Sequence, residues 1–228
     1  MGLSLCVGIL AEVRDDDPEG YTHFQEQLAL ANVVLARAGR SPHVEPEACE
    51  PWSAEMFGYG GLHYLRRVAA HLALRGRLPA PGDEHASRDR VVEAYGDLAT
   101  GTRRGLKRLL GKGEPRRQRF DHLMLHSDAE GFYVPVDFDD VLFADDGVAL
   151  AGGMLGSSQR LLRECLQLRD ALGIPQDLDP DADQLWELAD RQGEGAGWER
   201  YGVEAFTCVR LLHGAALSIE RAAALAFV

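Results

Sequence analysis

The sequence predicts an α+β fold: a single domain over residues 1–228, with a mostly antiparallel sheet built from hairpins and covered by about six helices. Three observations predict this class. Apolar residues recur at helical spacing in segments that begin at a capping residue or end at glycine. Two pairs of short apolar runs flank turn residues, as β-hairpins do. Helical and strand-like segments do not alternate regularly, which disfavours the parallel sheet of a nucleotide-binding fold.

The first quarter of the chain predicts one strand and two helices. Residues 3–10 alternate Leu, Val and Ile with smaller residues and read as a strand. Asp17, followed by proline and glutamate, predicts the N-cap of a helix over 18–37 that stops at a glycine. Residues 40–58 are rich in proline and polar residues and predict a surface loop. A second helix is predicted over 61–75, again followed by glycine.

The next segment predicts two short helices between loops. Residues 76–86 have the composition of a linker, and helices are predicted over 88–98 and 103–110. Residues 111–118 contain glycine and proline among charged residues. They predict a flexible internal loop.

Two hairpins are predicted after this loop. Residues 120–126 and 132–137 flank a five-residue turn that ends in glycine. Residues 141–144 and 148–151 flank Asp145-Asp146-Gly147, and an Asp-Gly pair suits a tight hairpin turn.

Three helices are predicted in the last third. A glycine-rich loop over 152–156 precedes a helix to Leu172, with Ser157 or Ser158 as its cap. A helix to Arg191 is predicted to start at Asp179-Pro180-Asp181. The final helix, over 203–226, is apolar on most faces and should lie at the centre of the core.

Charge is strongly segregated along the chain. Residues 102–119 hold eight Lys or Arg against one acid, whereas residues 120–158 hold no Lys or Arg and eight acids. The two blocks either pair internally or face a charged partner. The whole chain has a formal charge of −12, which disfavours general adhesion to DNA or to anionic membranes.

Several protein classes fit the sequence poorly. The four cysteines are far apart and form no CxxC pair, so we expect reduced thiols, no zinc site and a cytoplasmic location. The N-terminal apolar run lacks the basic start of a secretory signal, and no run is long enough to span a membrane. An abundance of Ala, Arg, Gly and Leu is typical of bacterial proteins.

Three groups of residues are candidates for small ligands, and each has a simpler interpretation. Backbone N–H groups at a helix start attract anions, so Gly153, Gly156, Ser157 and Ser158 form one candidate, with a turn and an N-cap as the favoured alternative. His63, Arg67 and His71 share one stripe of a helix and form a second anion site, or a solvated face.

His122 and His126, with Asp128, form the third candidate. On a strand, the two histidines would be about 13 Å apart, too far to share a metal ion. We expect no metal and no other cofactor. The favoured interpretation is that both histidines line the more solvated face of the sheet, and a role for one of them as a general base beside Asp128 is the functional alternative.

These observations favour a non-enzymatic cytoplasmic protein that binds another macromolecule, as inhibitor, immunity and adaptor proteins do. No motif of a hydrolase, zinc peptidase or cysteine nucleophile is present. The expected partner is a protein with a basic surface, because exposed carboxylates steer and orient basic partners. The candidate contact residues are the acids of the predicted hairpins: Asp128, Glu130, Asp137, Asp139, Asp140, Asp145 and Asp146.

Two alternatives stay open. The first is an enzyme or binding domain for an anionic or phosphorylated small molecule, which would combine the Gly152–Ser158 loop with His122, His126 and Asp128. The second is nucleic-acid binding, which the charge distribution allows only through Arg103–Arg119. The sequence does not predict the oligomeric state.

Overall fold

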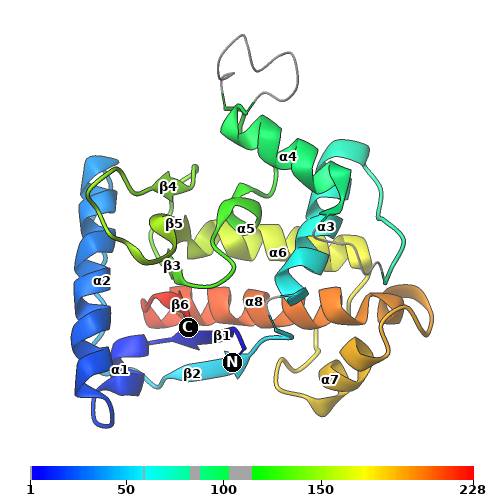
Figure 1. The fold of residues 1–228 in the computed structure, drawn as a ribbon. Coiled ribbons are helices and arrows are strands. Elements are labelled where there is room, and N and C mark those ends of the chain that lie inside the picture. The colour runs from blue at the N-terminus through cyan, green and yellow to red at the C-terminus, as the bar shows by residue number, and fades with distance from the viewer. Residues whose placement is uncertain (1, 59, 83–87, 103–114) are drawn as a thin grey trace.

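A computed structural model describes the chain except Met1, Tyr59 and residues 83–87 and 103–114. Within the described residues, eight α-helices pack on one six-stranded mixed sheet with the strand order β2-β1-β6-β3-β5-β4 (Figure 1). Every strand pair is antiparallel except β3 with β5. The α+β class and the mostly antiparallel sheet are therefore confirmed, although the sheet is not built from hairpins alone.

The strands are short, and most neighbours in the sheet are distant in sequence. Both chain ends meet in the sheet, because β1 near the N-terminus pairs with β6 near the C-terminus. The strand bounds are β1 (Ser4–Val7), β2 (Trp52–Glu55), β3 (Gly131–Val134), β4 (Leu142–Phe143), β5 (Met154–Ser157) and β6 (Leu225–Phe227).

Helices cover both faces of the sheet (Figure 1). One core packs α2 against alternate strand residues such as Phe132 and Ala226, and the larger core packs α3, α6 and α8 against the opposite set, such as Tyr133 and Leu225. The helix bounds are α1 (Ile9–Val13), α2 (Pro18–Arg37), α3 (Gly60–Arg75), α4 (Arg90–Thr100), α5 (Asp121–Leu125), α6 (Ser158–Leu172), α7 (Asp183–Asp190) and α8 (Gly202–Arg221).

Local signals predicted most helices correctly. Asp17 caps α2 by accepting a hydrogen bond from the Gly20 N–H at 2.9 Å, and α6 ends at Gly173 in the left-handed conformation. The final helix, α8, is buried along most of its length, as its apolar faces predicted. The predicted helix over 103–110 and residues 111–114 of the predicted loop lie outside the described residues.

Several boundaries and strand assignments were wrong. The helix predicted to start at Asp179-Pro180-Asp181 begins at Asp183, with Ala182 as its N-cap. The first strand ends at Val7, because Gly8 has a φ of 79° and turns the chain into α1. The predicted loop over 40–58 contains β2, which gains its partner from β1. The predicted last helix stops at Arg221, and β6 follows because it finds partners on both sides in the sheet.

Neither predicted hairpin forms, because the predicted strands in each pair do not bond to each other. Residues 121–125 form α5, so β3 pairs with β5 and β6 instead of with that segment. Strand β4 pairs with β5, and the predicted strand over 148–151 is part of their connection. The glycine-rich stretch predicted as a loop therefore includes a strand. None of the described helices meets the length and hydropathy needed to span a membrane.

Candidate functional site

Three of the seven predicted contact acids lie beside arginines of α6 or of the segment that leads into α5. Asp137 binds Arg160 at 3.0 Å and Arg163 at 3.2 Å, both on α6. Asp139 binds Arg160 and, at 3.0 Å, Arg117, which is also 3.8 Å from Asp140. Through Arg117, the described end of the basic block thus pairs with the acidic block inside the molecule.

The other four predicted acids have weaker or more varied contacts. Asp145 lies 3.1 Å from Arg37, and Asp128 lies 3.2 Å from His63. Glu130 accepts a hydrogen bond from the Gly152 N–H, and Asp146 is exposed. The sequence placed these acids on one hairpin surface, but nearby cations balance much of their charge.

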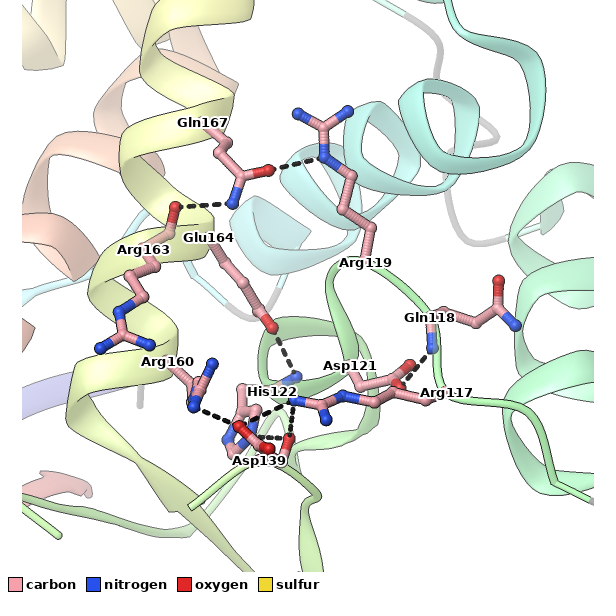
Figure 2. Close-up of a pocket in the computed structure, with 10 residues that line it drawn as sticks. All are labelled: Arg117, Gln118, Arg119, Asp121, His122, Asp139, Arg160, Arg163, Glu164 and Gln167. Carbon is pink, nitrogen blue, oxygen red and sulfur yellow. Dashed lines mark hydrogen bonds and ion pairs between the residues drawn. The ribbon is translucent and has the colours of Figure 1, made fainter. Parts of the chain in front are cut away.

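The arginines around Asp139 surround a pocket of about 240 Å³ (Figure 2). The pocket lies between α6, α5 and the segment that leads into α5. Its lining is strongly polar: Arg117, Gln118, Arg119, Asp121, His122, Asp139, Arg160, Arg163, Glu164 and Gln167. We call it the arginine pocket.

A buried carboxylate, Glu164, forms one wall of the arginine pocket and also caps α5. Its two oxygens accept hydrogen bonds from the His122 N–H at 3.1 Å and the Leu123 N–H at 2.8 Å. Burial outweighs these hydrogen bonds and raises the pKa of Glu164 to about 8. The side chain is therefore mostly protonated at neutral pH.

Asp121 on the same helix is held by Tyr95 from α4. The Tyr95 hydroxyl donates to Oδ1 of Asp121 at 2.9 Å and accepts from the Phe120 N–H at 3.0 Å. Burial raises the pKa of Asp121, partly countered by a hydrogen bond from the Gln118 N–H. These contacts fix the segment from which Arg117 and Arg119 project.

Both candidate histidines are buried in hydrogen-bond networks. Nδ1 of His122 accepts from the Ser157 N–H at 3.0 Å, so Nε2 is the donor to the Asp139 carbonyl oxygen at 3.1 Å. His126 stacks on Tyr133, with its ring nitrogens 3.0 Å and 3.1 Å from two backbone carbonyl oxygens. Burial lowers the pKa of each histidine to about 4, so both are neutral at pH 7.

The proposed anion-binding glycines and serines lie on or beside β5. Ser157 and Ser158 are fully buried, and the Ser158 hydroxyl is 2.7 Å from that of Ser218. Gly156 packs so closely on the Tyr133 ring that a Cβ atom would collide with it. Gly153 has a φ of 69° at the start of the strand. Close packing explains the glycine at 156, and the left-handed backbone explains the glycine at 153.

The stripe His63, Arg67 and His71 binds acids of this chain. Arg67 and His71 converge on Asp89, the N-cap of α4, at 2.8 Å and 3.0 Å, and His63 binds Asp128. Burial acts to raise the pKa of Asp89, but the hydrogen bonds from Arg67, the Val91 N–H and His71 dominate and lower it to about 2. The predicted convergence of donors is thus present, with Asp89 as its acceptor.

A larger acidic surface lies outside the segments that hold the predicted contact acids. Residue ranges 12–19, 47–55 and 177–190 together hold fourteen acids and one base, a net charge of −13. Since the whole chain is −12, all other residues sum to +1. All fourteen acids are exposed: Glu12, Asp15, Asp16, Asp17, Glu19, Glu47, Glu50, Glu55, Asp177, Asp179, Asp181, Asp183, Glu187 and Asp190. We call this set the acidic face.

Contacts join the three ranges into one band. Arg14 binds Glu47 at 3.7 Å, which ties the turn before α2 to the segment before β2. Arg210 donates to the carbonyl oxygens of Glu55 and Pro180, and the Trp52 indole N–H reaches Asp181 at 3.5 Å. In Figure 1, α1, the start of α2, β2 and α7 follow one another along the lower side of the molecule. The sequence signal for this surface is the strong excess of acids over bases in each of the three separate ranges.

One comparison with known proteins gives a match. A family model described as "Putative DNA-mimic protein" matches residues 1–227. No curated protein and no solved structure matches the chain.

Proposed function

The chain belongs to the putative DNA-mimic protein family, and from this premise we propose that it binds a DNA-binding protein in the place of DNA. Duplex DNA presents a dense row of negative charges, and its protein partners offer arginine and lysine side chains in a shaped groove. A protein that occupies such a groove needs exposed carboxylates over an extended surface. This role is binding and not catalysis, and we place it in the cytoplasm.

The observation that carries the proposal is the concentration of charge on the acidic face. Its three ranges have a net charge of −13, while the rest of the chain is nearly neutral. Only a few bases from other parts of the described chain approach it, among them Arg221 at 4.0 Å from Glu50 and Arg191 at 3.9 Å from Glu187. The acidic face therefore keeps most of its negative potential, which attracts a basic groove over several ångströms.

The hairpin acids form the rival surface for the same partner. They are Asp128, Glu130, Asp137, Asp139, Asp140, Asp145 and Asp146. We favour the acidic face because arginines already lie against Asp137, Asp139 and Asp145, so these acids have less charge to offer.

Capture followed by displacement with DNA tests the proposal. The immobilised chain is exposed to a lysate of its source cells, washed at low salt, and eluted with duplex DNA. We expect the DNA to release one or more DNA-binding proteins, because both ligands compete for the same basic groove. Captured proteins that stay bound in excess DNA would contradict DNA mimicry.

Two matched variants identify the surface. One replaces Glu12, Asp15, Asp16 and Asp177 on the acidic face with their amides, and the other replaces Asp139, Asp140, Asp145 and Asp146 in the same way. Each variant loses four charges. We expect the first to lose capture and the second to keep most of it, whereas the reverse would assign the interaction to the hairpin acids.

A further inference from the structure

We propose that the arginine pocket is a binding site for a small phosphate-bearing anion, separate from the acidic face. The site does not depend on DNA mimicry, because its residues lie on α5, α6, the segment before α5 and the connection between β3 and β4, outside the three acidic ranges. Its ligand class follows from the donors that converge there.

Four arginines line the pocket, two from α6 and two from the segment that leads into α5 (Figure 2). Arg160 and Arg163 project from α6, while Arg117 and Arg119 project from the segment that leads into α5. Planar guanidinium forks match the oxygens of phosphate and can bind them in pairs. The amide groups of Gln118 and Gln167 add neutral polar groups to the same lining.

The charge balance of the lining favours an anion. Four arginines contribute +4, and Asp121 and Asp139 contribute −2. The third acid, Glu164, is mostly protonated at neutral pH, because burial raises its pKa to about 8. The lining itself is thus close to +2 in a chain of −12, while Asp137 and Asp140, which lie outside the lining, pair with Arg160, Arg163 and Arg117 and compete with an anion for them. The overall negative charge of the chain repels phosphate, so binding depends on the positive charge of the lining.

Asp139 occupies the place of a ligand in the present structure. Its carboxylate bridges Arg117 and Arg160, one from each wall, and its side chain is 46% exposed. A phosphate group entering the pocket would take over these two donors and leave Asp139 free to turn toward solvent. Exposed ion pairs of this kind contribute little to stability, so the exchange has a low cost.

The size of the pocket limits the ligand. At about 240 Å³ it is below the roughly 300–1,000 Å³ of pockets for drug-sized molecules. The space suits a phosphate group that is free or carried on a small molecule, with the guanidinium forks around its oxygens.

Titration of the full chain with inorganic phosphate at constant ionic strength tests the proposal. The readout is the NMR signals of the arginine Nε–H groups, which report each guanidinium separately. We expect saturable shifts for Arg117, Arg119, Arg160 and Arg163 that chloride does not reproduce. A parallel titration with adenosine 5′-monophosphate distinguishes the source: tighter binding assigns an organic phosphate, and equal binding assigns the free anion.

Three variants decide the location. Arg119→Gln with Arg163→Gln removes two pocket charges from exposed positions and should weaken binding about tenfold or more. Arg191→Gln changes an exposed arginine at the C-terminal end of α7, outside the pocket lining, and should leave binding unchanged. Asp139→Asn removes the internal competitor and should tighten binding at least about threefold.

Two outcomes would overturn the proposal. One is the absence of saturable shifts in both the natural chain and the Asp139→Asn variant. The other is equal weakening by Arg191→Gln and by the double pocket variant, since binding would then follow total charge. A thermal unfolding curve for each variant shows that the comparison is made on folded protein.

Discussion

Arg66 and Glu164 bind opposite ends of the same helix, α5. The Glu164 carboxyl group accepts hydrogen bonds from the N–H groups of His122 and Leu123, and Arg66 donates from Nε to the Leu123 carbonyl oxygen at 2.9 Å and from Nη2 to that of His126 at 2.6 Å. A helix of five residues cannot satisfy its own terminal groups. These two side chains, from α3 and α6, do so for it.

Replacing Arg66 with lysine tests the C-terminal half of this arrangement. Lysine keeps the charge but lacks the fork that reaches both carbonyl oxygens in this buried place. We expect the free energy of unfolding to fall by about 1.5–3 kcal/mol, the typical contribution of a hydrogen bond to a charged group. Urea denaturation measures the loss, and hydrogen exchange should show faster opening of α5 than of α2. Unchanged stability would mean that α5 needs no cap from Arg66.

Stability should depend on pH with a maximum near pH 6.5. His122 and His126 have a folded-state pKa of about 4 against 6.5 unfolded, so the unfolded chain binds more protons between these values and stability falls as pH decreases through them. Glu164 has a folded-state pKa of about 8 against 4.5 unfolded, so stability falls as pH rises toward 8. Among these three groups, the two histidines outweigh the glutamate below pH 6.5, and only the glutamate changes stability above it.

The alkaline limb can be assigned to Glu164. Urea unfolding at several pH values from 4 to 8.5 should show a decrease of about 1–2 kcal/mol between pH 6.5 and 8. In a Glu164→Gln variant the slope in this range should flatten, even though the variant starts from lower stability because one N–H of α5 loses its acceptor. A slope that survives the substitution would assign the decrease to another group.

Asp89 should contribute more to the free energy of unfolding than an ordinary helix cap does. Asp89→Ala removes the cap of α4 and the ion pair to Arg67, which is only 6% exposed, whereas Asp17→Ala removes the cap of α2 at an exposed site. We expect about 1 kcal/mol for Asp17→Ala and about 3 kcal/mol or more for Asp89→Ala. Thermal or urea unfolding of both variants makes the comparison, and equal losses would show that Arg67 gains little from Asp89.

Binding of the proposed partner should depend on salt through the association rate. Long-range attraction between the acidic face and a basic groove accelerates encounter, and salt screens it. With a captured partner in hand, surface plasmon resonance at 50 and 200 mM NaCl should show a fall of about tenfold or more in the association rate constant and a smaller change in dissociation. The variant lacking Glu12, Asp15, Asp16 and Asp177 charges should show a shallower dependence. Equal salt dependence in both proteins would exclude the acidic face.

Elements with local signals were predicted with close boundaries. Asp17 and Pro18 fix the start of α2 and Gly39 fixes its end, because an N-cap acid, a proline in the first turn and a left-handed glycine each act within a few residues of the helix end that they mark. Gly173 ends α6 in the same way. The burial of α8 followed from apolar residues on most of its faces.

Elements that depend on distant partners were missed. Leu123 and Leu125 alternate with His122, Met124 and His126, a pattern typical of a strand, yet the segment is helical because Glu164 and Arg66 cap it. Residues 225–227 continue the apolar pattern of α8, but form β6 because β1 and β3 offer hydrogen bonds on both sides.

For the candidate surfaces too, some properties follow from the local sequence and others depend on contacts between distant segments. The sequence by itself determined the fold class, the net charge of −12 and its segregation into blocks, since these follow from composition and short-range pattern, and it predicted a binding role for exposed carboxylates. Only the tertiary structure decided which acidic side chains are paired with arginines inside the molecule and which stay exposed. It brought arginines from α6 against Asp137 and Asp139, and aligned acids from three distant segments along one side of the molecule. Coulomb energies depend on distance in space, and chain folding sets those distances.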